Sequence, residues 1–597
     1  MKELYRTNIA KCSLSGEWNG WNLSFHEESI QENCSVFHIG LKRESAAVPP
    51  KLLFTFGVPM IDAQVKWHPR RNLFDSHHFQ PRWWGSGKEP FMLNRDVGVY
   101  SWLNLEGINS VSFACSEMLY PVQITSGPLD GEGFENEILT DVYLFPYPCE
   151  PGTSFEISVR IDRRRIFYAD VLFDMTAWLG EKIVLPMPIP ETCRMPIYST
   201  WYQFQKNVTQ KALENELDLM MRANLGTLII DDGWQCAKTD GGGSDMSTCG
   251  EWNVSPGKFP DMKSFIARCH EKCLKVLFWV ALPYIGIAFP NLIERFRNMT
   301  LSECSDHVVL DPRYPEVRHW LTERCVRLVE QYHLDGLKLD FIDSMTTTPE
   351  NSNNAQLREG CDTVSLVCGI DRLLKEISSR LTAIDPDIMI EFRQHYTSPL
   401  MKQYANIFRA SDCPHDLLQN RVRTLDMRLL GGDSAVHSDM IIWSVLDSPE
   451  TAALQILSVL FATPQISCRL SSLPESHFRM LSFWMDFCRK HCRTLQFGRL
   501  RPEHPESSYP AVTSESDDES ITVIYGSDRI VRLNSVHRHI VINASHAEGL
   551  VVESANPCNA VLYNTFGEKT GRMEIAPGLT RIPVPLSGFA VCEMIES

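Results

Sequence analysis

The sequence lacks any apolar run long enough to cross a membrane, and it lacks an excess of basic residues. Its formal net charge is −17 at pH 7. Nucleic acids and anionic membrane surfaces are bound through clustered Lys and Arg, so a balance of this sign argues against both as the main partner. A neutral or cationic small molecule suits the chain better.

A disulfide framework is also missing, since the 19 cysteines are odd in number and irregularly spaced. Residues 1–6 lack the apolar stretch of a secretion signal, and both absences together favour a cytoplasmic protein. Cys269 and Cys273, like Cys488 and Cys492, are one helical turn apart, a spacing that more often indicates core packing than a metal site. We expect neither a metal nor a cofactor.

The first 190 residues have the pattern of antiparallel β structure. Segments such as 35–41, 52–56 and 155–161 are short, rich in β-branched and aromatic residues, and separated by Gly, Pro and Asn turns. We predict an N-terminal β-sandwich over residues 1–190. Trp83 and Trp84 within it could face a ligand, but an edge or core position is the commoner role of such residues.

After the proline-rich stretch 186–190, strands alternate with amphipathic helices. The predicted strands are 195–201, 228–234, 276–280, 333–343, 388–393, 407–412, 434–439 and 464–467. The predicted helices are 209–223, 262–272, 316–331, 365–384 and 478–492. Eight β/α units over about three hundred residues are what a closed (β/α)₈ TIM barrel requires. The predicted fold class is therefore multidomain α/β, with a central barrel over 191–494 and a small C-terminal antiparallel β domain, a second sandwich, over 495–597.

One predicted strand carries two opposite charges, Lys338 and Asp340. Side chains alternate along a strand, so both lie on one face, and the inward face of a barrel strand ends at the edge where barrel enzymes place their chemistry. Asp340 is therefore a candidate nucleophile, and the positive charge of Lys338 would keep its carboxylate ionised. A structural ion pair explains this strand alone equally well.

Polar or aromatic residues also end most of the other predicted strands. The candidate site residues are Trp201, Asp231, Asp232, Trp234, Lys338, Asp340, Glu391, Arg393, Arg409, Asp412, His437 and Asp439. Paired carboxylates suit glycoside hydrolysis, in which one attacks or activates water and the other supplies a proton. Aromatic faces and charged hydrogen-bonding groups suit a sugar, so we expect a small glycoside or oligosaccharide as the partner.

Three motifs carry a family resemblance: Asp231-Asp232-Gly233-Trp234, Leu337-Lys338-Leu339-Asp340 and Arg409-Ala410-Ser411-Asp412. In this order on barrel strands they resemble the retaining α-galactosidases of glycoside hydrolase clan D, and the three-domain layout is similar to the melibiases of family thirty-six. The resemblance implies a retaining exo-α-glycosidase, with α-galactosidase as the first choice. It would release terminal α-linked galactose by double displacement, with Asp340 as nucleophile and Asp412 as acid/base.

The same resemblance implies roles in sugar binding. Asp231 and Asp232 would hold the O4 and O6 hydroxyls. Lys338 would reach O3 and O4, Arg409 would bind O2, and Trp201 would stack on the ring. The remaining expected substrate contacts are Trp234, Glu391, Arg393, His437 and Asp439.

The chain departs from that family at two strands. The third usually ends in an acidic Glu-Pro-Glu type sequence, but here it runs through residues 280–283, Val-Ala-Leu-Pro. The fifth usually leads into Cys-Ser-Gly-Gly-Gly, but here it continues through 391–396, Glu-Phe-Arg-Gln-His-Tyr. We therefore expect a divergent member, and the choice among galactose, N-acetylgalactosamine and L-arabinopyranose stays open.

Two other hypotheses remain. A metal-dependent barrel hydrolase is motivated by His437 and Asp439, although no predicted barrel strand carries a His-x-His pair. A sugar-binding protein without catalysis is motivated by the divergent strands, although both candidate carboxylates are present. The sequence also leaves open whether the chain forms a homo-oligomer.

Overall fold

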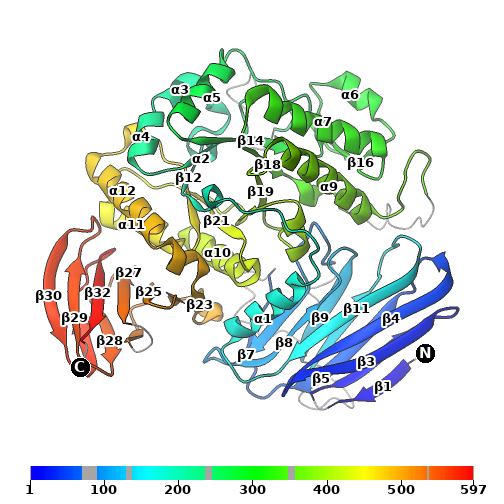
Figure 1. Ribbon diagram of the computed structural model, residues 1–597, viewed down its shortest axis with the longest axis horizontal. Coiled ribbons are helices and arrows are strands. Elements are labelled where there is room, and N and C mark those ends of the chain that lie inside the picture. Colours follow the sequence, from blue (N-terminus) through cyan, green and yellow to red (C-terminus); the bar gives the residue numbers. More distant parts are fainter. Residues whose placement is uncertain are drawn as a thin grey trace.

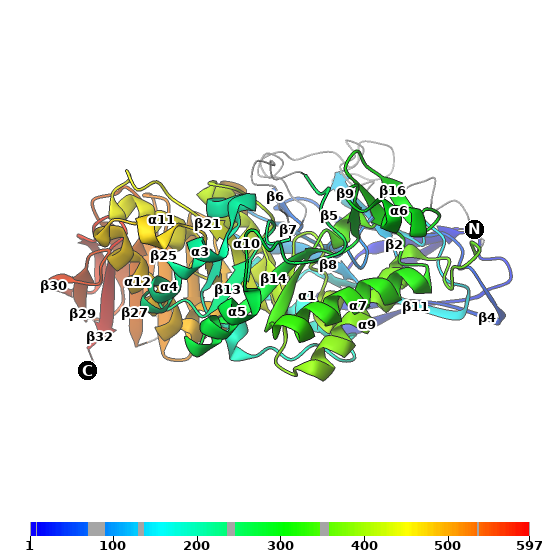
Figure 2. The same ribbon diagram turned by 90° about the horizontal axis from the view of Figure 1, so that it is seen from above.

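Two β-sheet regions flank a closed barrel, one on each side (Figure 1). Seen from above, the N-terminal and C-terminal sheets lie at opposite ends of the molecule with the barrel between them (Figure 2). The computed structural model describes residues 2–7, 9–69, 90–128, 137–235, 245–346, 357–533 and 537–595. Trp83 and Trp84 lie outside these residues. The predicted fold class is confirmed.

The N-terminal region is a sandwich of two antiparallel sheets. The first sheet has the order β1 (Lys2–Arg6), β2 (Lys11–Gly16), β5 (Leu52–Pro59), β10 (Glu137–Leu144) and β9 (Val122–Pro128). The second has the order β3 (Asn22–Gln31), β4 (Cys34–Ala47), β11 (Gly152–Asp162), β8 (Asn109–Cys115), β7 (Val99–Leu103) and β6 (Val65–Trp67). Alternate residues of both sheets, such as Phe37, Phe54 and Phe113, form the core between them.

One helix in this region was not predicted, α1 (Tyr168–Gly180). Its buried residues fall on one helical face at Tyr168, Val171, Leu172, Met175 and Leu179, a spacing of three to four residues. The Tyr168 hydroxyl donates to the Pro502 carbonyl at 2.9 Å, so α1 joins the sandwich to the beginning of the C-terminal region.

The barrel is built from eight parallel strands, as predicted. They are β12 (Ile197–Ser199), β13 (Thr227–Ile230), β14 (Lys275–Ala281), β18 (Gly336–Asp340), β19 (Met389–Arg393), β20 (Ile407–Arg409), β21 (Ala435–Ile441) and β22 (Thr463–Ile466). Near the strand beginnings, apolar side chains including Ile229, Leu277 and Met389 pack together and close the N-terminal end. Gly336 leaves room in this layer, because a Cβ there would lie 2.1 Å from the Met389 carbonyl oxygen.

Helices surround the barrel (Figure 1). Their bounds are α2 (Trp201–Phe204), α3 (Gln210–Glu214), α4 (Leu217–Arg222), α5 (Met262–Glu271), α6 (Pro290–Arg295), α7 (Pro315–Tyr332), α9 (Leu366–Ile384), α10 (Leu417–Gly431), α11 (Pro449–Ser458) and α12 (Glu475–Lys490). The single helix predicted over 209–223 is divided into α3 and α4. A small sheet that was not predicted follows β14, with the order β15 (Tyr284–Gly286), β17 (His307–Leu310) and β16 (Thr300–Glu303).

The C-terminal region consists of two sheets. The larger has the order β23 (Arg499–Pro502), β24 (Ala511–Glu515), β25 (Glu519–Ile524), β27 (Arg538–Asn543), β32 (Phe589–Met594), β29 (Cys558–Tyr563) and β30 (Lys569–Ile575). The smaller has β26 (Ile530–Leu533), β28 (Leu550–Ser554) and β31 (Gly578–Ile582). Most neighbours pair antiparallel, as predicted, but β25 with β27 and β26 with β28 pair parallel because the chain changes sheet between them. We propose that the domain boundaries lie near residues 190 and 494.

A loop of the N-terminal region contacts the barrel directly. The Asn94 amide donates to the carbonyls of Ile342 at 2.9 Å and Met345 at 2.8 Å, in the loop that follows β18. The Asp96 backbone N–H donates to the His395 carbonyl at 2.6 Å, in the loop that follows β19. Both barrel loops begin at candidate site residues, so the sandwich helps to position the site.

The 18 cysteines of the described segments are all unpaired thiols. Of the helices in those segments, none combines the length and the apolar character that a membrane span needs.

Candidate active site

Side-chain alternation in β18 places Lys338 and Asp340 inside the barrel, as predicted. The register pairs Lys338 with Trp279 of β14 and with Glu391 of β19, so these three residues lie at one level of the barrel. Asp340 lies two residues further along, at the carboxyl end, where barrel enzymes place their chemistry.

Asp340 is an ionised carboxylate held by three donors. Arg393 Nε donates to Oδ1 at 2.5 Å, the Phe341 backbone N–H donates to Oδ1 at 2.8 Å, and Trp279 Nε1 donates to Oδ2 at 2.9 Å. Burial opposes ionisation, but the charges of Arg393 and Lys338 and the bond from Trp279 hold the pKa of Asp340 well below its usual range. Its negative charge is therefore retained at any physiological pH.

Aromatic rings enclose the Arg393 guanidinium. It lies 5.2 Å from the Phe341 ring centroid and 5.7 Å from that of Tyr396, and Tyr284 stacks on Phe341 at 4.8 Å. Both terminal nitrogens of Arg393 also approach the Asp343 carboxylate at 3.5 Å. Arg393 is therefore held between two carboxylates, those of Asp340 and Asp343.

The pair of aspartates after β13 is buried and bonded differently at each position. Lys338 Nζ donates to Asp231 Oδ2 at 2.6 Å. Asp232 Oδ1 accepts from Gln235 at 2.8 Å, whereas Oδ2 has no hydrogen-bond donor within the described part of the chain and lies 3.4 Å from Lys206 Nζ. Burial raises the pKa of Asp232 to about 6. The nearest charged group to Oδ2 is therefore the Lys206 ammonium, and this oxygen is buried.

Arg409 connects three carboxylates at the end of β20. Its guanidinium donates to Asp439 Oδ1 at 2.5 Å and to Asp412 Oδ1 at 2.9 Å, and its Nε lies 3.5 Å from Glu391 Oε1. Glu391, Arg409 and Asp439 are all buried, whereas 54% of the Asp412 side chain is exposed. Asp412 therefore lies at the entrance of the site.

The pKa of Asp412 depends on its neighbours. Its partial burial and the negative charge of Asp340 raise the pKa, but the positive charges of Arg409, Lys338 and Arg393 together more than offset them and lower it. Arg393, which bonds Asp340, is paired in the β19–β20 register with Arg409, which bonds Asp412, so both carboxylates lie at the same end of the barrel on neighbouring arginines.

Asp439 and His437 of β21 have their hydrogen-bonding groups occupied by protein. Asp439 Oδ2 accepts from the Tyr202 hydroxyl at 2.6 Å and from the Cys413 backbone N–H at 2.8 Å. His437 Nε2 donates to the Cys193 carbonyl at 2.6 Å, and Nδ1 accepts from Gln465 Nε2 at 3.2 Å. Burial lowers the pKa of His437 to about 3, so the ring is neutral.

These contacts bear on the metal hypothesis. Both ring nitrogens of His437 and both oxygens of Asp439 already have partners, so neither side chain directs a lone pair at an ion. Over the described ranges, no three His, Cys, Asp or Glu side chains form a group that could hold a metal ion.

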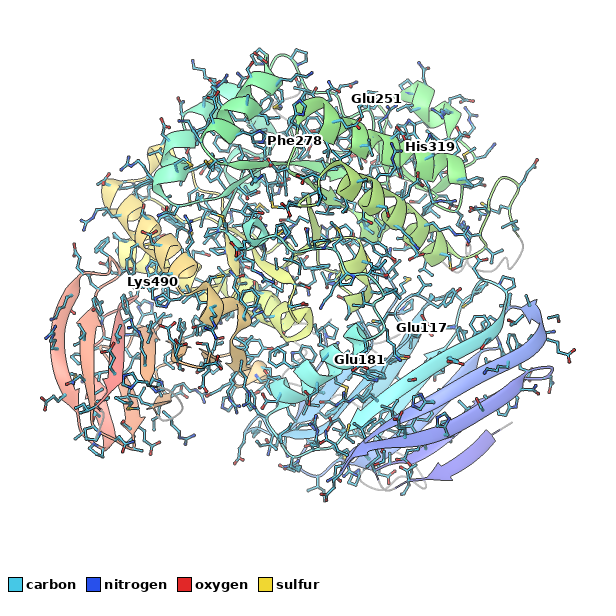
Figure 3. All side chains as sticks on the ribbon, in the orientation of Figure 1. Glu117, Glu181, Glu251, Phe278, His319 and Lys490 are labelled. Atoms are coloured by element: carbon cyan, nitrogen blue, oxygen red, sulfur yellow. The ribbon has the colours of Figure 1, made fainter. Side chains whose placement is uncertain are left out.

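Trp234 and Trp201 differ in access. Trp234 is 0% exposed, its Nε1 donates to the Trp279 carbonyl at 3.0 Å, and its ring packs on Phe278 at 4.6 Å. Phe278, labelled in Figure 3, alternates along β14 with the inward Trp279 and so faces away from the barrel interior. This position leaves no surface for a sugar, so the predicted contact of Trp234 is corrected to a packing role. Trp201, half-buried at the start of α2, keeps a face open to solvent.

Several residues that contact the site were not singled out from the sequence. They are Tyr202, Trp279, Tyr284, Phe341, Asp343, Tyr396 and Gln465. Gln465 is on a predicted barrel strand and donates to Glu391 Oε2 at 2.7 Å, so its inward position could have been found from strand alternation.

Residues 191–397, which contain the strands β12 to β19, match the melibiase family. The glycosyl hydrolase DigH of Escherichia coli O6:H1 is 24% identical over 211 residues, which cover 30% of this chain and 46% of DigH. The chain thus spans less than half the length of that relative.

Two solved structures share the whole fold. An α-galactosidase from Lactobacillus brevis superposes with a TM-score of 0.62 at 14% identity, covering 100% of this chain and 85% of that one. A variant of the GH36 α-galactosidase AgaA from Geobacillus stearothermophilus, in complex with raffinose, superposes with a TM-score of 0.60 at 13% identity, covering 100% of this chain and 87% of that one. Over residues 191–397 the chain is thus similar to the melibiases, and its three-part architecture is the fold of these two α-galactosidase structures.

Proposed function

We propose that the protein is a retaining exo-α-glycosidase, with α-galactosidase as the first choice, in which Asp340 is the nucleophile and Asp412 the acid/base. The single observation that carries the proposal is the pair of unlike carboxylates in one site. Asp340 is buried and held ionised, whereas Asp412 is half-exposed at the entrance. The pKa of both carboxyls is lowered, but only Asp412 is exposed enough for a bound glycoside to change its protonation, so we assign the attack to Asp340 and the proton transfer to Asp412.

The bonding of Asp340 selects its attacking atom. Oδ1 accepts two hydrogen bonds and Oδ2 accepts one from the described residues, so Oδ2 keeps a lone pair. Oδ2 would attack the anomeric carbon, the bond to the leaving oxygen would break, and a glycosyl ester would form. Esterification removes the negative charge of Asp340, and Arg393 would then pair with Asp343, which is already 3.5 Å away.

Asp412 must hold a proton in the first step. A bound glycoside would exclude water from its exposed half, and a sugar hydroxyl that accepts a bond from Arg409 would draw that cation away. Both changes raise the pKa of Asp412. Once Asp340 is esterified, its charge no longer raises the pKa of Asp412, which then acts as base toward water.

The buried aspartates suit a galactose-type ring. Asp232 Oδ2 offers an acceptor to a hydroxyl, and Lys338 with Asp231 offers a donor and an acceptor side by side. The raffinose complex of AgaA supports galactose as the first sugar to try. Three of the expected contacts would not touch the sugar directly. Glu391 and Asp439 would position Arg409, and His437 would position Gln465.

A panel of nitrophenyl α-glycosides tests the proposal, with the anomeric configuration of the first product followed by NMR. We expect cleavage of the α-galactoside and an α-configured product. Asp340→Asn should lower kcat/KM by about 10⁴-fold or more. Asp412→Asn should cost about 10²- to 10⁴-fold with a poor leaving group and much less with dinitrophenol. Asp517→Asn, at a side chain that is 91% exposed, is the matched control.

Full turnover by Asp340→Asn would refute the nucleophile, and a β-configured first product would refute retention. Faster cleavage of the N-acetylgalactosaminide or the L-arabinopyranoside would assign one of those sugars instead. Failure to release nitrophenol from any α-glycoside would favour the non-catalytic sugar-binding alternative. The cytoplasmic location and the homo-oligomer stay predictions.

A further inference from the structure

A cavity lies at the N-terminal end of the barrel, the end opposite the candidate active site. Its volume is about 890 Å³, and its walls come from the segment after α1, the residues before β12, β20 and β21, and the end of α12. Glu181 and Lys490, labelled in Figure 3, are the chain neighbours of two of its lining residues, Gly180 and Arg489. The volume is that of a small-molecule site.

Cations line the inner part of this cavity. Arg194 donates to the Ser434 carbonyl at 3.2 Å, and its guanidinium stacks on the Phe497 ring at 4.2 Å. Arg428, 3% exposed, lies behind Arg194 and donates to the Leu495 carbonyl at 3.4 Å. Neither arginine forms an ion pair with a carboxylate of the described ranges. Arg194, which is half-buried, and Arg428, which is buried, therefore donate here to neutral acceptors.

The acidic residues of this region are at the rim. Asp433 lies 3.7 Å from Lys402 Nζ, but 86% of its side chain is exposed, so water screens its charge. Glu191, the other acidic lining residue, is also exposed. The Lys402 side chain is only 14% exposed. The charged side chains in the interior of the cavity are therefore positive, whereas those at its rim include both signs.

Burial has a consistent effect on these cations. It lowers the pKa of Arg194 and of Lys402, and burial together with the charge of Arg194 lowers the pKa of Arg428 to about 10. Each group would be stabilised by an anion placed among them.

Two polar atoms at this place have no hydrogen-bond partner among the described residues. They are Ser434 Oγ, on a residue that lines the cavity and is 1% exposed, and Arg428 Nε. Buried donors are normally satisfied, and Ser434, which lines the cavity, points to an acceptor that binds there. Next to them, Met187 and Ile189 provide an apolar wall.

We propose that this cavity binds a small organic anion whose phosphate or carboxylate group lies against Arg194 and Lys402 and whose apolar body packs on Met187 and Ile189. The guanidinium of Arg194 suits either oxyanion, because both present two oxygens in one plane. The ligand differs from the neutral glycoside of the active site, and its binding does not depend on the proposed activity.

A cysteine in the cavity wall can report ligand binding. Cys492 lines the cavity and is half-buried, whereas Cys273 and Cys304 are exposed elsewhere. The full-length protein would be alkylated with iodoacetamide, with and without hexyl phosphate as the test ligand. Mass spectrometry would follow the alkylation of each thiol. At ten times its dissociation constant, hexyl phosphate should slow alkylation of Cys492 about tenfold and leave Cys273 and Cys304 unchanged.

Variants assign the effect to the cations. Lys402→Met and Arg194→Met should each weaken protection of Cys492 about tenfold or more, because a charge-assisted bond is lost. Lys375→Met, an exposed position on α9, is the matched control. Lys402→Met keeps the test decisive if Arg194→Met does not fold, since burial already disfavours the charge of Lys402.

Hexanol and inorganic phosphate separate the two parts of the ligand. Both should protect less than hexyl phosphate if the cavity binds an amphipathic anion. Equal protection by hexanol, equal protection of the Lys402→Met protein, or no protection of Cys492 by hexyl phosphate would each overturn the proposal.

Discussion

Arg393 offers the sharpest test of how the site keeps its nucleophile charged. Its Nε lies 2.5 Å from Asp340 Oδ1, and the two side chains are only 12% and 10% exposed. An opposite charge at such a distance lowers a carboxyl pKa by about 1–3 units, equivalent to about 1.4–4 kcal/mol. Arg393→Met keeps most of the volume between Phe341 and Tyr396 and removes that charge.

The expected result is a shift of the acid limb of kcat/KM toward higher pH by about two units. In the proposed mechanism Asp340 attacks only when ionised, so a higher pKa would protonate it, and stop turnover, at a higher pH. The acid limb of kcat/KM reports this ionisation in the free enzyme. The assay is the pH dependence of kcat/KM on the nitrophenyl glycoside that is cleaved fastest.

Asp343→Asn is the control for this experiment. It removes the second partner of Arg393 but leaves the guanidinium beside Asp340, so the limb should stay in place or move to lower pH. A folded, active Arg393→Met enzyme whose acid limb coincides with that of the wild type would refute the reasoning. Arg393 would then not be the group that keeps the nucleophile ionised.

Other expected outcomes concern charge at buried positions. Asp439→Asn should lower kcat about 10²-fold, because Arg409 loses the anion that positions it, and steady-state kinetics would detect this. Lys338→Met should lower the free energy of unfolding by about 3–5 kcal/mol, because the Asp231 carboxylate is left buried without its cation. Replacing both residues by apolar ones should recover much of that free energy, as measured by urea unfolding. Burial raises the pKa of Glu117 from 4.5 to about 7, so the folded state binds its proton more tightly and stability falls as pH rises through 7. Glu117→Gln should therefore raise the free energy of unfolding at pH 8 by up to about 3 kcal/mol and change little at pH 4.

The sequence was sufficient for the barrel and for the position of Asp340. Side chains alternate along β18, so Lys338 and Asp340 lie on the face opposite its apolar residues. This follows from the strand's own sequence, without information on the neighbouring strands. The end of each strand then indicates where a side chain must lie in a closed barrel.

Other site residues depend on contacts that no local pattern contains. Phe278 and Trp279 are adjacent aromatic residues of a fully buried strand, so the sequence does not tell which of them points inward. Trp279 bonds the nucleophile, whereas Phe278 packs outside against Trp234. His437 is fixed by the Cys193 carbonyl, which is 244 residues away in the chain.

The bond between Asn94 and the loop after β18 has a consequence for handling this protein. Asn94 and Ile342 are 248 positions apart, yet one side chain of the sandwich supports the turn directly downstream of Asp340, the proposed nucleophile. A barrel cut free of its first sandwich would expose those two carbonyls to water and lose the support on one side of that turn. Truncated, chimeric or evolved versions of the barrel should therefore retain the N-terminal sandwich.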